Sequence, residues 1–94
     1  MQFEWDTDKA FQNLNKHGIT FAEAQSVFDD PLFVDYLDRT HSIDEERFLI
    51  VGRSLLGKQI IVSYTSRNGI IRLNSARKTT MKEDAVYEKQ FERR

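Results

Sequence analysis

A two-residue turn signal constrains the fold of this chain more than any other feature of its sequence. Asn68-Gly69 falls where the run KQIIVSYTS ends and the run GIIRLNSAR begins, both rich in strand-forming residues. This residue pair suits a tight β-hairpin, because both of its positions tolerate the positive φ angles that the turn needs. The signal predicts an antiparallel hairpin in which Arg67 lies opposite Ile70 and Tyr64 opposite Leu73.

A third strand-like run, RFLIVGRS (47–54), precedes the hairpin and leads into a turn centred on Leu56-Gly57. Counting from the two turns predicts which side chains share each face of the sheet. The predicted core face consists of Leu49, Val51, Val62, Tyr64, Ile71 and Leu73. The predicted open face is half polar, as in a sheet exposed to solvent or ligand. It consists of Phe48, Ile50, Ile61, Ser63, Thr65, Arg72 and Asn74.

Three helices are expected from their start and stop signals. These are a cap at Asp6 or Thr7, a glycine stop at Gly18, capping boxes at Thr20–Glu23 and Thr80–Glu83, and a stop near Pro31. Short strands are expected in QFEW (2–5) and LFVDYL (32–37). The order β-α-α-β-β-β-β-α predicts a single α+β domain over residues 1–94. It has one antiparallel sheet, two N-terminal helices and one C-terminal helix, with the helices on one side.

The composition is that of a cytoplasmic globular protein. The 94 residues suffice for one domain, and the absence of cysteine excludes disulfides and thiolate metal sites. The longest aliphatic run, Ile60-Ile61-Val62, is far shorter than a membrane helix. The N-terminus carries acids where a secretion signal would carry basic residues. A cytoplasmic location is therefore expected.

The net charge of −1 hides an uneven distribution. Residues 1–47 contain four basic and eleven acidic side chains, which gives −7. Residues 48–94 contain ten basic and four acidic side chains, which gives +6. This asymmetry favours one surface for a polyanion and another for a basic partner. The alternative is that the two halves neutralise each other within the fold.

Two arginines fall at one end of the predicted sheet. The count from the turns puts Arg53, Ile60 and Arg77 in one cross-strand row, so the two guanidinium groups start about 10 Å apart. The row lies beside the start of the last helix, whose free backbone N–H groups attract anions. Together these groups would form a phosphate clamp. The alternative is that each arginine pairs with a nearby carboxylate such as Glu83.

An RNA substrate would bring its own nucleophile, the 2′-hydroxyl. Cleavage then requires a base for this hydroxyl, an acid for the leaving oxygen and cations for the charge that develops around phosphorus. The candidate acids and bases are His17, Glu83, Tyr64 and Tyr87. Structural alternatives are a helix C-terminus for His17, a capping box for Glu83 and the core for Tyr64. His17 and His41 lack partners at metal-ligand spacing, so neither a metal nor another cofactor is expected.

Several short motifs keep the order and spacing of a known family over nearly the whole chain. They are EWD (4–6), KHG (16–18), Phe21 with Ala24 and Phe28, ERF (46–48), GR (52–53), SAR (75–77), and Glu83 with Tyr87. Together they resemble the BrnT toxins of bacterial type II toxin–antitoxin modules. The resemblance implies a RelE-like fold and a metal-independent ribonuclease that cleaves RNA and inhibits translation. It also implies neutralisation by a BrnA-like ribbon-helix-helix antitoxin, with DNA bound only through the antitoxin complex and no membrane partner.

The resemblance and the predicted open face together imply roles for individual residues. The expected catalytic residues are Arg53, Arg77, Glu83, Tyr87 and His17. The expected RNA-binding residues are Lys16, Arg72, Asn74 and Lys78. The chain departs from the family at Asn74, where an aliphatic residue is common, and at Asp84, where an arginine is common. Asp84 lowers the positive charge of the expected RNA site.

The alternative function is that of a non-catalytic protein- or RNA-binding module of the same fold. Such a module would account for the charge distribution and the open sheet face, but not for two arginines beside a helix N-terminus. Direct DNA binding is disfavoured because no predicted helix is basic along one face. Bacterial growth and RNA integrity after expression of the chain alone would separate a toxin from a binding module.

Overall fold

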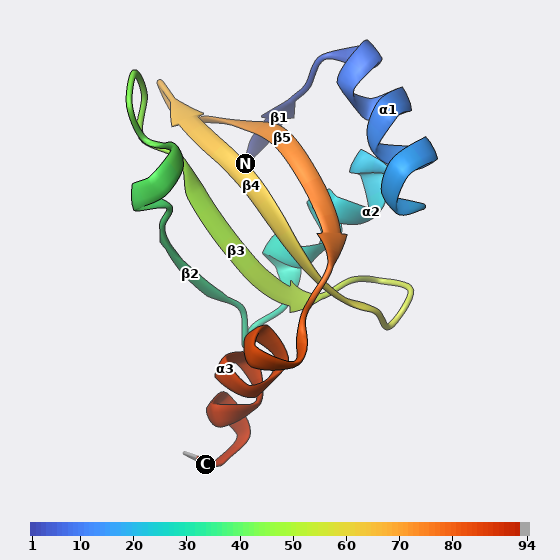
Figure 1. Ribbon diagram of the computed structural model, residues 1–94, viewed down its shortest axis with the longest axis vertical. Helices are drawn as coiled ribbons and strands as arrows, with labels where there is room; N and C mark the ends of the chain where they lie inside the picture. Colours follow the sequence, from blue (N-terminus) through green and yellow to red (C-terminus); the bar gives the residue numbers. More distant parts are fainter. Residues whose placement is uncertain (93–94) are drawn as a thin grey trace.

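The computed structural model describes residues 1–92, which form one five-stranded sheet, three α-helices and two 3₁₀ helices (Figure 1). The elements are β1 (Gln2–Glu4), α1 (Thr7–His17), α2 (Phe21–Ser26), η1 (Val27–Asp29), β2 (Val34–Leu37), η2 (Arg39–His41), β3 (Phe48–Arg53), β4 (Gln59–Arg67), β5 (Ile70–Lys78) and α3 (Met81–Glu92). The predicted α+β class and the order of strands and α-helices are confirmed. None of the described helices is long and apolar enough to cross a membrane.

One strand departs from the predicted antiparallel sheet. The strand order is β1-β5-β4-β3-β2, and β1 runs parallel to β5 whereas the other neighbours pair antiparallel. Gln2 lies opposite Ile70 and Glu4 lies opposite Arg72. A short alternating pattern marks a strand but not its direction. The two turns before β5 set the direction of that strand, and β5 runs the same way as its neighbour β1. The sheet is therefore mixed, and the antiparallel prediction is wrong at β1.

The hairpin of β4 and β5 has the predicted register next to its turn. Arg67 pairs with Ile70, and Tyr64 pairs with Leu73. Asn68 has a φ of 51° and Gly69 a φ of 80°, which are the positive angles that the tight turn requires. The turn residues therefore predicted the pairing over this part of the hairpin correctly.

A β-bulge at Asn74 shifts the rest of the hairpin by one residue. The pairing changes directly after Tyr64, and Ser75 is the next residue of β5 to have a partner on β4. Arg77 consequently lies opposite Ile61 instead of Ile60. The predicted cross-strand row of two arginines is therefore wrong on the β5 side.

The register of β3 is also displaced by one residue. In the loop 54–58 the Ser54 N–H donates to the Lys58 carbonyl (2.8 Å), and Arg53 lies opposite Gln59 rather than Ile60. A one-residue shift exchanges the two faces of a strand. Four β3 residues therefore lie on the face opposite to the predicted one, namely Phe48, Leu49, Ile50 and Val51.

The main core lies between one face of the sheet and the helices α1 and α2. Its buried members are Ile19, Phe21, Ala24, Val27, Ile50, Ile60, Val62, Tyr64, Leu73 and Ala76. Val62, Tyr64 and Leu73 belong to it as predicted, and Ile71 packs against it while half-buried. The predicted core faces of β4 and β5 are thus confirmed for these residues.

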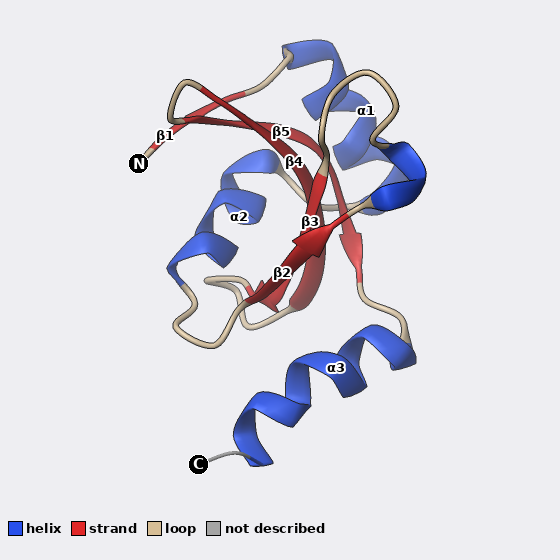
Figure 2. Cartoon of the chain, turned by 90° about the vertical axis from the view of Figure 1, so that its left-hand side faces the viewer, coloured by secondary structure: helices blue, strands red, loops and turns tan. Residues whose placement is uncertain are grey.

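α3 packs against the opposite face of the sheet. Its Tyr87 is buried together with Val51 and Ile61, and Leu32 and Leu49 pack against this smaller cluster. Figure 2 shows α3 well apart from α1 and α2. The prediction that all helices lie on one side is wrong. The displaced register of β3 turns apolar side chains toward this face, and α3 covers them.

A buried asparagine holds α1 against the edge of β5. Asn13 donates from Nδ2 to the carbonyls of Ile19 and Ala76, both at 2.9 Å, and its Oδ1 accepts the Ala76 N–H at 2.9 Å. β1 covers this edge of β5 at residues 70–72. Further along the edge, the Asn13 amide pairs with the backbone as a neighbouring strand would. This contact sets the position of α1 relative to the sheet.

We expect Asn13→Ala to lower the free energy of unfolding by about 2–3 kcal/mol, because it leaves buried backbone groups without partners. Urea denaturation measures the difference. Asn15→Ala, an exposed substitution on the same helix, is the matched control and should cost less than about 0.5 kcal/mol. An equal cost for the two variants would contradict the role given to Asn13.

Candidate active site

A cleft of about 380 Å³ lies on the sheet face opposite the main core. Its lining residues are Lys16, His17, Leu49, Ile61, Ser63, Ser75 and Arg77. Its floor follows from the register, in which Leu49 pairs with Ser63 and Ser63 with Ser75. None of the described residues that line it carries a carboxylate. This Arg77 cleft brings together three predicted site residues, Lys16, His17 and Arg77.

The last turn of α1 carries Lys16 and His17 to the cleft. The helix ends at Gly18, whose φ of 70° lets its N–H donate to the Leu14 carbonyl at 2.8 Å. One turn earlier, Asn13 holds the helix on the backbone of β5. Lys16 and His17 therefore lie beside β5 because of the contact between Asn13 and Ala76, and Asn13 is not part of the KHG motif.

Arg77 and Glu83 form a two-point ion pair at the rim of the cleft. Nη1 of Arg77 lies 2.9 Å from Oε1 of Glu83, and Nη2 lies 2.9 Å from Oε2. Glu83 Oε1 also accepts the Thr80 N–H at 2.8 Å, which confirms the predicted capping box. The hydrogen bond with Arg77 is the main cause that lowers the pKa of Glu83. The alternative in which the arginine pairs with a carboxylate is thus what the structure shows for Arg77.

Tyr36 on β2 lies near the Arg77–Glu83 pair, and the sequence alone did not predict this position. It pairs with Leu49 in the register of the sheet, so it lies on the same face as the Arg77 cleft. Its side chain is 42% exposed. Burial and the nearby charge of Glu83 raise the pKa of its phenol. Only the pairing of β2 with β3 shows that this tyrosine lies near the ion pair.

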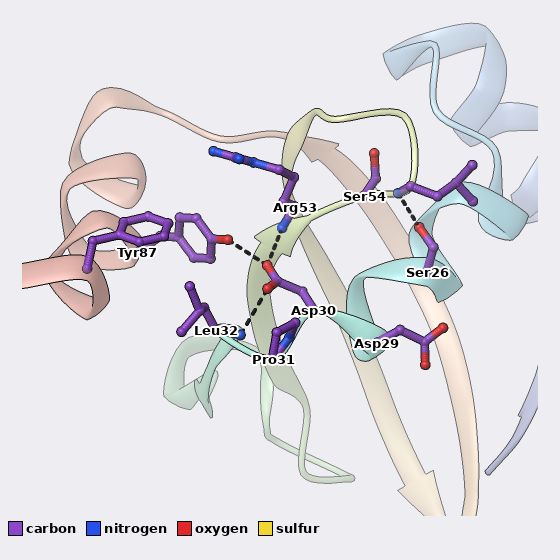
Figure 3. A pocket seen from close by; sticks show the side chains of 10 residues that line it. Ser26, Asp29, Asp30, Pro31, Leu32, Arg53, Ser54 and Tyr87 are labelled. Carbon is purple, nitrogen blue, oxygen red and sulfur yellow. Dashed lines mark hydrogen bonds between the residues drawn. The ribbon is translucent and has the colours of Figure 1, made fainter. Parts of the chain in front are cut away.

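Arg53 and Tyr87 line a different cavity, of about 400 Å³ (Figure 3). The Tyr87 hydroxyl donates to Asp30 Oδ2 at 2.6 Å, and the Arg53 backbone N–H donates to the same oxygen at 2.8 Å. The Leu32 N–H donates to Asp30 Oδ1 at 2.9 Å. Burial and the hydrogen bond to Asp30 raise the pKa of Tyr87 to about 12. In this structure Asp30 therefore acts as an anchor for α3.

The two predicted arginines do not form one clamp in this structure. Tyr87 packs on Val51, which precedes Arg53 by two residues, and on Ile61, which pairs with Arg77. Each arginine lines a separate cavity. Figure 3 shows the Arg53 guanidinium directed away from Asp30. Of the expected catalytic residues, the Arg77 cleft holds Arg77 and His17, with Glu83 bonded at its rim.

The expected RNA-binding residues are spread along β5. Arg72 lies 3.6 Å from Glu4 in an ion pair between β5 and β1. Asn74 lines a groove beside α1 that adjoins the Arg77 cleft. Lys78 is exposed at the end of the strand. Lys16 alone of these four lines the Arg77 cleft itself.

Ion pairs link the acidic and basic halves of the sequence. Glu45 pairs with Arg67, Glu4 with Arg72, and Glu23 with Lys58 at 3.8 Å. The basic residues Arg93 and Arg94 lie outside the described part of the chain. These ion pairs therefore neutralise part of the opposite charges of the two halves within the fold. The Arg77 cleft keeps a basic lining.

The acidic and imidazole side chains are dispersed. Within residues 1–92, no three or more His, Asp or Glu side chains lie close enough together to hold a metal ion. His41, one of the two histidines, lies 2.9 Å from Asp38 through its Nδ1 atom. His17 lines the Arg77 cleft.

Stability should depend on pH through Asp30. Burial alone would raise the pKa of this carboxyl, but the hydrogen bonds from Arg53, Tyr87 and Leu32 outweigh burial and lower it. A lowered pKa adds stability above the ordinary value of the group, and this stability is lost as the pH falls through the folded-state pKa. We expect Asp30→Asn to cost about 1–2 kcal/mol at neutral pH and less at about pH 3.

Urea denaturation at the two pH values tests this expectation. Asp29→Asn, which alters an exposed carboxyl lining the same cavity, is the matched control and should cost less than about 0.5 kcal/mol at neutral pH. A cost of Asp30→Asn that is the same at both pH values would contradict the anchoring role.

Comparisons with known proteins identify the fold and the family of this chain. The crystal structure of the Brucella abortus ribonuclease toxin, BrnT, superposes with a TM-score of 0.64 at 20% sequence identity, over 86% of this chain and 99% of that chain. At this identity the likeness shows the fold. No curated protein sequence matches the chain. The family model described as "Ribonuclease toxin, BrnT, of type II toxin-antitoxin system" matches residues 5–83, which include the Arg77 cleft and Glu83. The chain belongs to this BrnT family of toxins.

Proposed function

We propose that this protein cleaves RNA in the Arg77 cleft and thereby inhibits translation. The observation that carries the proposal is the cleft itself, where Lys16, His17 and Arg77 meet on an open sheet face without a carboxylate in the described lining. Cationic donors of this kind bind phosphate and stabilise the charge that develops when it is attacked. Membership of the ribonuclease toxin family supports the same reaction.

The reaction needs two proton transfers. The 2′-oxygen attacks the neighbouring phosphorus and loses its proton to a base, while the bond from phosphorus to the 5′-oxygen breaks and that oxygen takes a proton from an acid. We assign the phosphate to Arg77, because Arg77 lines the cleft and its planar donor edge, which holds the two oxygens of Glu83, equally fits two oxygens of a phosphate. His17 and Glu83 are the candidates for the acid and the base.

The Arg77–Glu83 pair links substrate binding to proton transfer. When a phosphate takes the guanidinium edge of Arg77, Glu83 loses the bond that is the main cause of its lowered pKa. Its pKa then rises, and the carboxylate becomes a stronger base at the moment when the 2′-hydroxyl is in place. Tyr36 lies on the same face and supplies a further hydroxyl near the pair.

We give Arg53 and Tyr87 supporting roles from the neighbouring cavity. The Tyr87 hydroxyl anchors α3 on Asp30, and the first turn of α3 carries Glu83. The backbone of Arg53 bonds the same carboxylate, which leaves its side chain free to meet a more distant part of the RNA. Both residues then affect activity through the position of Glu83 or through binding.

Arg77→Ala should reduce RNA cleavage by on the order of 10²–10³. Thermal stability should change little, because a half-exposed ion pair contributes about 0–1 kcal/mol. The measurement is cleavage of a labelled RNA by purified protein in excess chelator, since we propose a mechanism without metal. Induced expression in bacteria provides a parallel test of growth.

Two variants control this experiment. Arg77→Lys keeps the charge but not the planar donor edge, and should recover part of the activity. Arg67→Ala removes an exposed arginine of the same sheet that is bonded to Glu45, and should leave activity unchanged. Full activity of a folded Arg77→Ala protein would overturn the assignment. Cleavage that stops when chelator is added would overturn metal independence.

We further propose that a BrnA-like ribbon-helix-helix antitoxin neutralises this protein and supplies the DNA contacts of the complex. The basic Arg77 cleft suits acidic groups that imitate phosphate. The apolar members of the predicted open face, Phe48, Ile50 and Ile61, are not available for an antitoxin contact. Ile50 is 0% and Ile61 3% exposed, and Phe48 packs against the core. Exposed apolar side chains lie elsewhere, including Phe11, Leu14, Leu55 and Leu56.

The antitoxin complex should persist in about 1 M salt, because apolar contacts outlast screened ion pairs, while its formation should slow as salt increases. A pull-down with the product of the adjacent gene at low and high salt measures both effects, and a promoter-binding assay follows. Failure to associate at low salt, or promoter binding by this chain alone, would contradict the proposal.

A further inference from the structure

A second groove, of about 250 Å³, runs between α1 and β5. Its lining residues are Lys9, Gln12, Asn13, Lys16, His17, Asn74 and Ser75. Three of them also line the Arg77 cleft, namely Lys16, His17 and Ser75. The two depressions therefore adjoin, and together they follow the edge of β5 from Arg77 toward the start of α1. We name the second depression the α1 groove.

The wall formed by α1 offers donors to a ligand. Lys9, Gln12 and Lys16 are spaced three and four residues apart, which places them on one face of a helix. Asn13 holds this face against β5 through its bonds to Ala76. From Lys9 to Lys16 the helix rises about 10 Å, so the two ammonium groups serve separate parts of an extended ligand.

The opposite wall contains the β-bulge at Asn74. The extra residue has no partner on β4, and its side-chain amide nitrogen is buried without a hydrogen-bond acceptor among the described residues. A buried donor without a partner costs free energy, so a movement of the Asn74 side chain that brings this nitrogen to a ligand oxygen in the groove is favoured. The bulge thus supplies a donor next to Ser75, at the junction with the Arg77 cleft.

The chemistry of the lining selects an anion. None of the described residues that line the α1 groove carries a carboxylate, and its charged members are two lysines. The groove is longer than a single phosphate and continues into the cleft where we place the scissile phosphate. A strand with phosphates at regular intervals fits these features, with ammonium groups at the phosphates and amides at phosphate or 2′-hydroxyl oxygens.

We propose that the α1 groove binds a second phosphate of the RNA strand and directs the part of the strand on this side of the scissile phosphate along α1, away from α3. The proposal rests on cleavage in the Arg77 cleft and adds Lys9, Gln12 and the bulge at Asn74 to the binding surface. The enzyme then prefers substrates that extend beyond the scissile phosphate on one side. A dinucleotide, which has a single phosphate, does not reach the groove.

The test compares Lys9→Glu with the wild-type protein. Lys9 is exposed in the first turn of α1, where a glutamate suits the helix dipole, so the variant should fold at least as well. Binding of a hexanucleotide with 2′-O-methyl groups, which cannot be cleaved, is measured over a range of salt concentrations. We expect at least about tenfold weaker binding and a salt dependence reduced by about 0.7 per lost phosphate contact.

Cleavage of a dinucleotide should be unchanged in Lys9→Glu, whereas Arg77→Ala should reduce it as strongly as it reduces cleavage of longer RNA. Lys89→Glu, on the last turn of α3, is the matched control for charge and should bind the hexanucleotide like the wild type. Equal hexanucleotide binding by Lys9→Glu and the wild type, with dinucleotide cleavage intact, would overturn the α1 groove but not the Arg77 cleft.

The remaining outcomes are also decisive. Loss of antitoxin binding in Lys9→Glu, with RNA binding unchanged, would assign the groove to a protein partner and overturn the proposal. A wild-type protein that neither binds the hexanucleotide nor cleaves the dinucleotide would overturn the proposed function, and the α1 groove with it.

Discussion

The bond between the Asn13 amide and the backbone of Ala76 is the constraint on which the rest of the structure depends. It joins a helix to a strand 63 residues later, and it is buried, so water does not replace it when it is lost. A side-chain amide suits this place because it offers a donor and an acceptor with the spacing of a peptide group. Both the Arg77 cleft and the α1 groove take residues from α1 and β5, so this contact helps to set the distance between their walls.

The position of Glu83 depends on a second constraint, the Asp30 carboxylate. It accepts hydrogen bonds from β3, from the segment before β2 and from Tyr87 on α3. Gly52 makes the approach of β3 possible, because a Cβ there would lie 2.9 Å from Val27 Cγ1 and 3.1 Å from Asp30 Oδ2. Arg77 on β5 and Glu83 on α3 are thus held by independent contacts, and their bidentate pair forms where the two elements meet.

The predictions that were confirmed concern signals read over a few residues. The Asn68-Gly69 turn, the Gly18 stop and the capping box at Thr80–Glu83 form as expected. At the start of α2, Thr20 accepts the Glu23 N–H as expected, but the Glu23 carboxylate accepts a hydrogen bond from Ser54 instead of closing the box. The predicted faces were wrong for β3, because the loop 54–58 displaced its pairing with β4 by one residue. The predicted row of arginines was wrong for this reason and because the bulge at Asn74 displaced the pairing of β5 by one residue. Neither the bulge at Asn74 nor the direction of β1 has a local sequence signal comparable to an Asn-Gly turn.

The sequence by itself determined the elements, the hairpin turn, the family motifs and the presence of basic residues near the end of α1 and of β5. Only the tertiary structure decided that Lys16, His17 and Arg77 share one cleft and that Arg53 lines another cavity. It also decided that Tyr36 lies on the same sheet face as this cleft and that Lys9 lines the adjoining groove. The physical reason is the range of the interactions. Turns and caps depend on neighbours a few residues away, whereas the site depends on contacts such as Asn13 with Ala76 and Asp30 with Tyr87, which are 63 and 57 residues apart.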